Sequence, residues 1–172
     1  MSGWIEKVEF KKISPGAPCG FEGFLPLKGL AESKCAEIPE KPGVYLILTP
    51  STQMPGFNAD NPTFKEGKLQ PRTVEALQKQ WNASTHILYI GKAGGADNDS
   101  NLKKRLNQYF TWFFGKGSGH DGGRDIWQID HPGELLVAWR VTEDKDPESC
   151  EKALLDKFTA EFKKLPFANH RH

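Results

Sequence analysis

The segment from residue 87 to residue 110 constrains the fold more than any other part of the chain. Residues 87–90 (Ile-Leu-Tyr-Ile) are apolar throughout, which is typical of a short strand buried on both faces. With His86 included, we expect a strand over residues 86–90, ended by Gly91, and a loop over residues 91–101. A helix should then follow the loop, so the segment predicts a sheet that packs against a helix.

The helix is expected from Leu102 to about Phe114, with Ser100 or Asn101 as its N-cap. Arg105 and Tyr109 are four residues apart and should therefore lie on one face of this helix. The same stretch thus places a cation and a phenol close to the end of a buried strand.

Two further strands are predicted from their apolar runs. Pro42-Gly43 forms a turn before residues 44–48, and residues 135–141 form a similar run. A short edge strand is also expected over residues 4–10, although the alternation there is poor.

Two more helices complete the expected elements. The spacing of Val74, Leu77 and Trp81 predicts a short helix within residues 71–81. A longer one should start at Asp146-Pro147 and end near Lys164 before Pro166. Its core-facing side chains should be Cys150, Leu154, Phe158 and Phe162.

Composition and charge limit the domain organisation and the kinds of partner that we expect for this chain. A chain of 172 residues with 37% hydrophobic content can bury a core, so we expect one folded domain at residues 41–172, preceded by an irregular extension at residues 1–40. The formal net charge of +1 excludes a protein that is basic overall. A basic face is still expected between residues 102 and 124, where Lys and Arg outnumber acidic residues.

Several site types are disfavoured by residue spacing. The cysteines Cys19, Cys35 and Cys150 form no CxxC pair, and the five histidines form no HxxxH or HExxH pair, which argues against a zinc site. A nucleophilic Cys150 or serine would lack a positioned histidine. No secretory leader or membrane-spanning run is evident, so a cytoplasmic protein without a membrane partner is expected.

The reactive residues have ordinary explanations one at a time. A tyrosine in a buried strand usually serves packing, and Glu151 in the first turn of a helix is explained by the helix dipole. Together they suggest chemistry on a phosphodiester. A cation and a divalent metal would favour the phenolate form of a tyrosine, and one glutamate can hold Mg²⁺ if waters and a phosphate complete its octahedron.

These residues also stand in an order that resembles the GIY-YIG nuclease superfamily, most closely the nuclease domain of the UvrC-type excision-repair subunit. The resemblance spans about residues 42–169, with insertions at residues 49–85 and 94–101. Its five blocks are Pro42-Gly43-Val44-Tyr45, Tyr89-Ile90-Gly91-Lys92-Ala93, the helix carrying Arg105 and Tyr109, Glu151-Lys-Ala-Leu-Leu155, and Leu165-Pro-Phe-Ala-Asn169.

The resemblance implies an α/β (α+β) fold with a small, mainly antiparallel three-stranded sheet flanked by helices. It also implies an endonuclease that hydrolyses DNA with Mg²⁺ or Mn²⁺. Tyr45 or Tyr89 would activate the water, and the sequence leaves open which. Lys92 would assist, Arg105 and Tyr109 would bind the scissile phosphate, Glu151 would hold the metal and Asn169 would brace the site.

The insertions leave the substrate open. We expect DNA contacts from Lys103, Lys104, Lys116, His120 and Arg124, and a role in DNA repair or restriction. One alternative is a module of the same fold that binds nucleic acid or protein without cutting. The sequence also leaves open whether the protein forms a homodimer. Cleavage of both DNA strands by a protein with one active site usually requires paired subunits.

Overall fold

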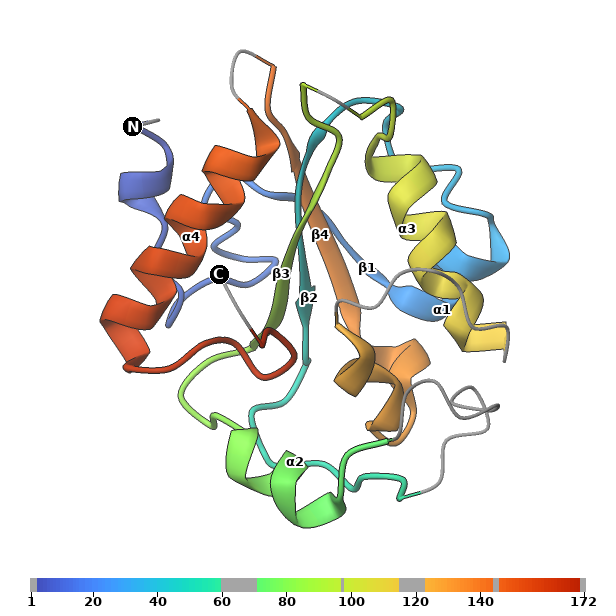
Figure 1. The fold of residues 1–172 in the computed structure, drawn as a ribbon, viewed down its shortest axis with the longest axis vertical. Coiled ribbons are helices and arrows are strands. Elements are labelled where there is room, and N and C mark those ends of the chain that lie inside the picture. The colour runs from blue at the N-terminus through green and yellow to red at the C-terminus, as the bar shows by residue number, and fades with distance from the viewer. Residues whose placement is uncertain (1–2, 60–70, 97, 115–122, 144–145, 171–172) are drawn as a thin grey trace.

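The fold is a mixed α/β structure built on a four-stranded antiparallel sheet. It is described here from a computed structural model, which covers residues 3–59, 71–96, 98–114, 123–143 and 146–170. Within these residues the strands β1 (Glu22–Pro26), β2 (Gly43–Leu48), β3 (Ile87–Ala93) and β4 (Leu136–Val141) lie in the order β1-β4-β2-β3. The mixed, antiparallel class predicted from the sequence is confirmed, and the sheet has one strand more than the predicted three (Figure 1).

The central strands β2, β3 and β4 match the three apolar runs of the sequence. Tyr45 on β2 pairs with Gly91 on β3 and with Trp139 on β4, so β2 has a neighbour on each side. The predicted turn at Gly91 is wrong, because Gly91, Lys92 and Ala93 continue β3 and pair with β2. The apolar run predicts too short a strand here, because the last residues of β3 include a glycine and a lysine.

The additional strand β1 comes from the N-terminal region. It pairs with β4 through a bulge at Phe24, where Gly23 (φ 93°) and Phe24 (φ 54°) adopt left-handed backbone conformations. Such a bulged edge strand shows little sequence alternation, so it was not predicted. The edge strand predicted at residues 4–10 is wrong, because that segment holds only the short 3-10 helix η1 (Ile5–Lys7).

The two longer helices begin where their capping residues predict. In α3 (Leu102–Phe110) the backbone N–H of Lys104 donates to the Asn101 side chain at 2.9 Å. In α4 (Pro147–Phe162) the N–H of Ser149 donates to Asp146 at 3.1 Å. Helix α3 gives way after Phe110 to the 3-10 helix η3 (Thr111–Phe114), earlier than predicted.

Shorter helices complete the described elements. They are α1 (Leu27–Glu32), α2 (Val74–Gln80), and the 3-10 helices η4 (Arg124–Gln128) and η5 (Pro132–Glu134). Helix α2 was predicted from its leucine and tryptophan spacing. No helix among the described residues is both long and apolar enough to cross a lipid bilayer.

Helices cover both faces of the sheet, α1 and α3 on one side and α4 on the other (Figure 1), and a hydrophobic core lies on each face. On one face Tyr45 and Ile47 of β2 pack against α1 and α3. On the other face Val44, Leu46 and Leu48 pack against α4. Because side chains alternate along a strand, β2 supplies both cores, as expected for a strand with no exposed residue.

The N-terminal segment belongs to the second core. Phe10 is fully buried and packs edge-on against Phe158 of α4, with 5.2 Å between ring centroids. The Lys157 ammonium donates to the backbone carbonyl of Ile5 at 3.1 Å. Residues 3–21 are therefore irregular in secondary structure but are an integral layer over α4.

Candidate functional site

A pocket of about 410 Å³ opens where β2, β3, α3, α4 and the C-terminal tail meet. It gathers most of the side chains predicted to be catalytic, although these are up to 124 positions apart in sequence, from residue 45 to residue 169. The lining comprises Tyr45, Tyr89, Lys92, Ala93, Gly94, Asn98, Ser100, Arg105, Gly123, Glu151, Leu155, Ala168, Asn169 and His170.

Tyr45 and Tyr89 face the pocket from neighbouring strands. Their ring centroids are 6.0 Å apart. Gly91, opposite Tyr45 in the sheet, makes room for this arrangement, because a Cβ atom there would lie 2.4 Å from the Tyr45 ring carbon that bears the hydroxyl. The glycine is therefore required by the phenol that crosses over it.

Burial makes both phenols weaker acids than a tyrosine in water. Desolvation raises the pKa of Tyr89 to about 12, with the Glu151 carboxylate adding to the rise and Arg105 opposing it. Desolvation likewise raises the pKa of Tyr45 well above its usual range. Tyr89 is 8% exposed and Tyr45 is fully buried, so Tyr89 is the phenol that a water molecule in the pocket can reach more directly.

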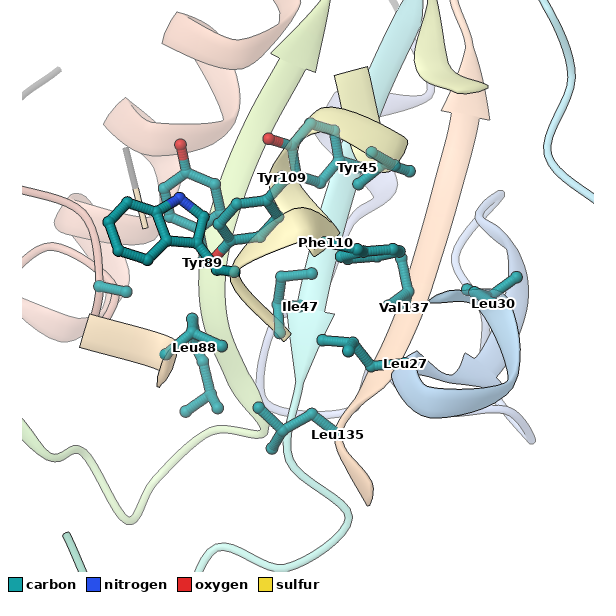
Figure 2. Packing of buried hydrophobic residues seen from close by; sticks show 14 of the residues in the cluster. Leu27, Leu30, Tyr45, Ile47, Leu88, Tyr89, Tyr109, Phe110, Leu135 and Val137 are labelled. Carbon is teal, nitrogen blue, oxygen red and sulfur yellow. The ribbon is translucent and has the colours of Figure 1, made fainter. Parts of the chain in front are cut away.

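Tyr109 lies behind the other two tyrosines and does not line the pocket. Its ring centroid is 6.0 Å from that of Tyr89, and its hydroxyl donates to the Gly123 carbonyl at 2.6 Å. Figure 2 shows the three tyrosines grouped in the core beside Phe110. The predicted contact of Tyr109 with phosphate does not match this buried position, since Tyr109 instead supports Tyr45 and Tyr89.

Arg105 and Lys92 supply positive charge from different sides. Arg105 projects from α3, and its field lowers the pKa of Tyr45, Tyr89 and Glu151. Lys92 lies 3.4 Å from the Glu148 carboxylate and lowers the pKa of Glu151. Arg105 rather than Lys92 is thus the cation that acts on both phenols.

Among the described residues that line the pocket, Glu151 is the one with an acidic side chain. Desolvation raises its pKa to about 7, Lys92 and Arg105 lower it, and Glu148 raises it. A carboxylate kept partly out of water next to two cations has an electrostatic environment typical of functional sites. Its unfavourable solvation would be relieved by a bound cation.

The donor set fits a hard cation held by few protein ligands. Among the residues that the structure describes, no group of three or more His, Cys, Asp or Glu side chains could form a protein cage for a metal ion. Mg²⁺ differs from zinc in that it commonly keeps several waters and takes only one or two carboxylates. Glu151 could therefore hold Mg²⁺ or Mn²⁺ only together with waters and a substrate oxygen.

Asn169 braces the pocket wall through its side-chain amide. Its Oδ1 accepts from the Ile90 N–H and its Nδ2 donates to the Ile90 carbonyl, both at 2.9 Å. The Ala168 N–H also donates to the Leu88 carbonyl at 2.8 Å. The tail therefore pairs with the open edge of β3, and the amide of Asn169 is committed to that strand.

Of the predicted DNA-contacting residues, the three that the structure describes do not line the pocket. Lys103 lies 3.7 Å from Glu40, and Lys104 is exposed on α3. Arg124 is half-buried at the start of η4. The other two, Lys116 and His120, lie outside the described residues, so the structure does not bear on them.

A buried polar cluster beside the pocket was missed by sequence reasoning. Asp125 is 4% exposed, and its Oδ2 lies 2.9 Å from His170 Nε2, 2.9 Å from Gln80 Nε2 and 3.5 Å from Arg72 Nε. His170 also lines the pocket. The position of His170 directly after Asn169 could have predicted that His170 lies near the pocket. Nothing in the sequence linked Arg72 or Gln80 to residue 125.

Other missed residues come from the segment between β3 and α3. Gly94, Asn98 and Ser100 line the pocket, and the Ser100 N–H donates to the Asn98 side chain at 2.7 Å. Cys150, by contrast, is 2% exposed in the core on the other face of the sheet.

Comparison of the chain with protein-family models, with curated proteins and with solved structures finds no match.

Proposed function

We propose that the chain is a metal-dependent endonuclease that hydrolyses phosphodiester bonds of DNA, with Mg²⁺ or Mn²⁺ as its cofactor. The observation behind the proposal is that Tyr45, Tyr89, Arg105 and Glu151 all line one pocket. A phenol pair, a guanidinium and a partly buried carboxylate are a coherent set for phosphoryl transfer, in which positioning and charge stabilisation do most of the work.

Tyr89 is the residue assigned to orient and deprotonate the attacking water. A phenol with a pKa of about 12 is a poor base at neutral pH, so it needs added positive charge to act. Tyr45 assists from the adjacent strand, because hydrogen bonding to Tyr45 lowers the pKa of Tyr89. Arg105 favours the same ionisation.

Arg105 is also assigned to the scissile phosphate. A guanidinium presents paired N–H donors that match two phosphate oxygens. One terminal nitrogen of Arg105 donates to Gln108 at 3.2 Å, which holds the side chain along α3. Lys92 lines the pocket and pairs with Glu148 at 3.4 Å, and its charge favours the ionised form of Glu151.

Glu151 is assigned as the protein ligand of the metal. When bound, the ion would supply Lewis-acid charge to the phosphate and lower the pKa of the attacking water. Asn169 contacts β3 rather than the pocket's centre, so its role is to position Tyr89 through Ile90.

The proposal is tested by incubating supercoiled plasmid with the protein in Mg²⁺, with and without chelator. We expect nicked or linear product that requires the metal. The Glu151→Ala and Tyr89→Phe variants should each cut more slowly by about 10²–10⁴-fold, the usual contribution of such groups. A Lys28→Gln variant is the matched control, since Lys28 is exposed on α1 away from the pocket.

Cleavage that persists in both Glu151→Ala and Tyr89→Phe would refute the assignment of the site. Binding of DNA with no cleavage under any divalent metal would instead favour a non-catalytic nucleic-acid-binding module of the same architecture.

A further inference from the structure

A second hollow of about 320 Å³ lies next to the pocket. Asn169 and His170 line both spaces, so the two lie side by side. The hollow is formed by α2, which lies in the insertion after β2, and by the chain that follows α4. Its basic side chains are Arg72, Lys79, Lys164 and His170.

The hollow is positively charged. Among the described residues, none of those that line it carries a carboxylate. The carboxylate of Asp125, whose side chain is 5% exposed, contacts Arg72 and His170 from behind. Three permanent cations therefore face the hollow, while one carboxylate is buried beneath them.

Contacts with Asp125, Gln80 and His170 hold the Arg72 side chain in place. Arg72 lies between Asp125, Gln80 Oε1 at 2.9 Å and His170 Nδ1 at 3.0 Å, yet its side chain is 43% exposed. Each terminal guanidinium nitrogen carries two N–H groups, so these contacts leave donors for a ligand. An anion would thus meet a preorganised guanidinium, which reduces the entropy lost on binding.

Lys164 is held in a similar way from the other side. Its ammonium donates to the Trp81 carbonyl at 3.1 Å, and Lys79 is exposed on α2 near the end of the helix.

Another hollow on the molecule differs from this one in its charged side chains. The hollow that contains Lys28 and His131 also contains Glu32 and Glu134, so a basic hollow without acidic side chains is not a general property of this surface.

We propose that this hollow binds the backbone phosphate of a nucleic-acid strand beside the phosphate that is cut. The inference rests on the proposed nuclease function and names where its substrate is held. A strand with its scissile phosphate at Arg105 and Glu151 would pass over residues 169–170 and place a neighbouring phosphate between Arg72 and Lys79. The insertion after β2 therefore contributes to substrate binding.

The test measures binding of a fluorescein-labelled DNA oligonucleotide to full-length protein in chelator, by anisotropy at several salt concentrations. All proteins carry Glu151→Gln so that no cleavage occurs. Adding Lys79→Gln should weaken binding about 3–10-fold and lower the salt slope by about one, as expected for one lost phosphate contact. Lys28→Gln serves as the matched control and should leave both quantities unchanged.

An unchanged affinity and salt slope in Lys79→Gln would overturn the inference, even if the protein cuts DNA. Loss of binding in Lys79→Gln in a protein that never cuts would support the hollow and refute the nuclease proposal. Absence of any DNA binding by the parent protein at low salt would refute both. Because Lys79 is exposed, its neutralisation is not expected to prevent folding.

Discussion

At the scale of single residues, two glycines allow close packing in the strands beside the pocket, and one carboxylate, that of Glu151, gives the pocket a negative charge. A Cβ atom at Gly43 would lie 2.3 Å from the Arg140 carbonyl, and one at Gly91 would overlap the Tyr45 ring. Both positions lie inside strands. Their role is to permit close approach of a backbone and of a phenol, rather than to form turns.

Glu151 is expected to lower the stability of the metal-free protein above neutral pH. Its pKa rises from 4.5 to about 7 on folding, so the folded state binds more protons between these values and stability falls as pH increases through them. In chelator at pH 8, Glu151→Gln should therefore be more stable by about 1–2 kcal/mol, a figure reduced for partial solvent exposure. Near pH 4.5 the difference should vanish.

The measurement is the urea midpoint of both proteins at the two pH values. Glu22→Gln is the control, because Glu22 is exposed on β1, does not line the pocket and should contribute little at either pH. Equal stability of Glu151→Gln and the parent at pH 8 would show that burial of the Glu151 carboxylate does not destabilise the folded protein.

At the scale of elements, the tail and the insertion after β2 are joined through Asp125. Gln80 of α2 donates both to Asp125 and to the Phe167 carbonyl, each at 2.9 Å. The rings of Phe57 and Phe167 stack with 5.8 Å between centroids. These contacts hold the tail so that Asn169 can pair with β3.

Replacing Asp125 with Asn should loosen this junction. The amide oxygen can take the place of Oδ2 but carries no charge, so the Arg72 guanidinium loses its ionic partner and the contacts with His170 and Gln80 weaken. We expect a loss of about 1–3 kcal/mol in the free energy of unfolding and slower DNA cleavage at the same protein concentration. Urea denaturation and the plasmid assay measure the two effects.

Asp156→Asn is the matched control, since Asp156 is an exposed partner of Lys152 on α4 and such surface pairs contribute little. If Asp125→Asn matched the parent in both stability and cleavage, the junction would have no role in holding the tail.

Element boundaries were predictable wherever a local signal exists. Asn101 and Asp146 mark helix starts because their side chains accept backbone N–H groups, and these contacts are present. Strand β1 escaped prediction because its pairing with β4 is made through a bulge and depends on tertiary contacts. The same holds for the Asp125 cluster, whose members Arg72 and His170 are 98 positions apart.

At the scale of the whole molecule, the order of motifs along the chain predicted which side chains meet, but not where nucleic acid would lie. Tyr45, Tyr89, Arg105 and Glu151 do line one pocket. Of the basic residues expected on one face, Arg105 lines the pocket, whereas Lys103 and Lys104 do not. Charge counted along the sequence cannot show which cations share a surface, since that depends on how α2 and the tail pack.

The most direct measurement is the single-turnover rate of DNA cleavage in Mg²⁺ by Glu151→Gln, compared with the parent protein. Glutamine keeps the size of the side chain and removes the charge that would hold the metal. We predict a rate lower by about 10³-fold in a protein that is folded and no less stable than the parent at pH 8. A cleavage rate within tenfold of the parent would contradict the assignment of this pocket as a metal-dependent nuclease site.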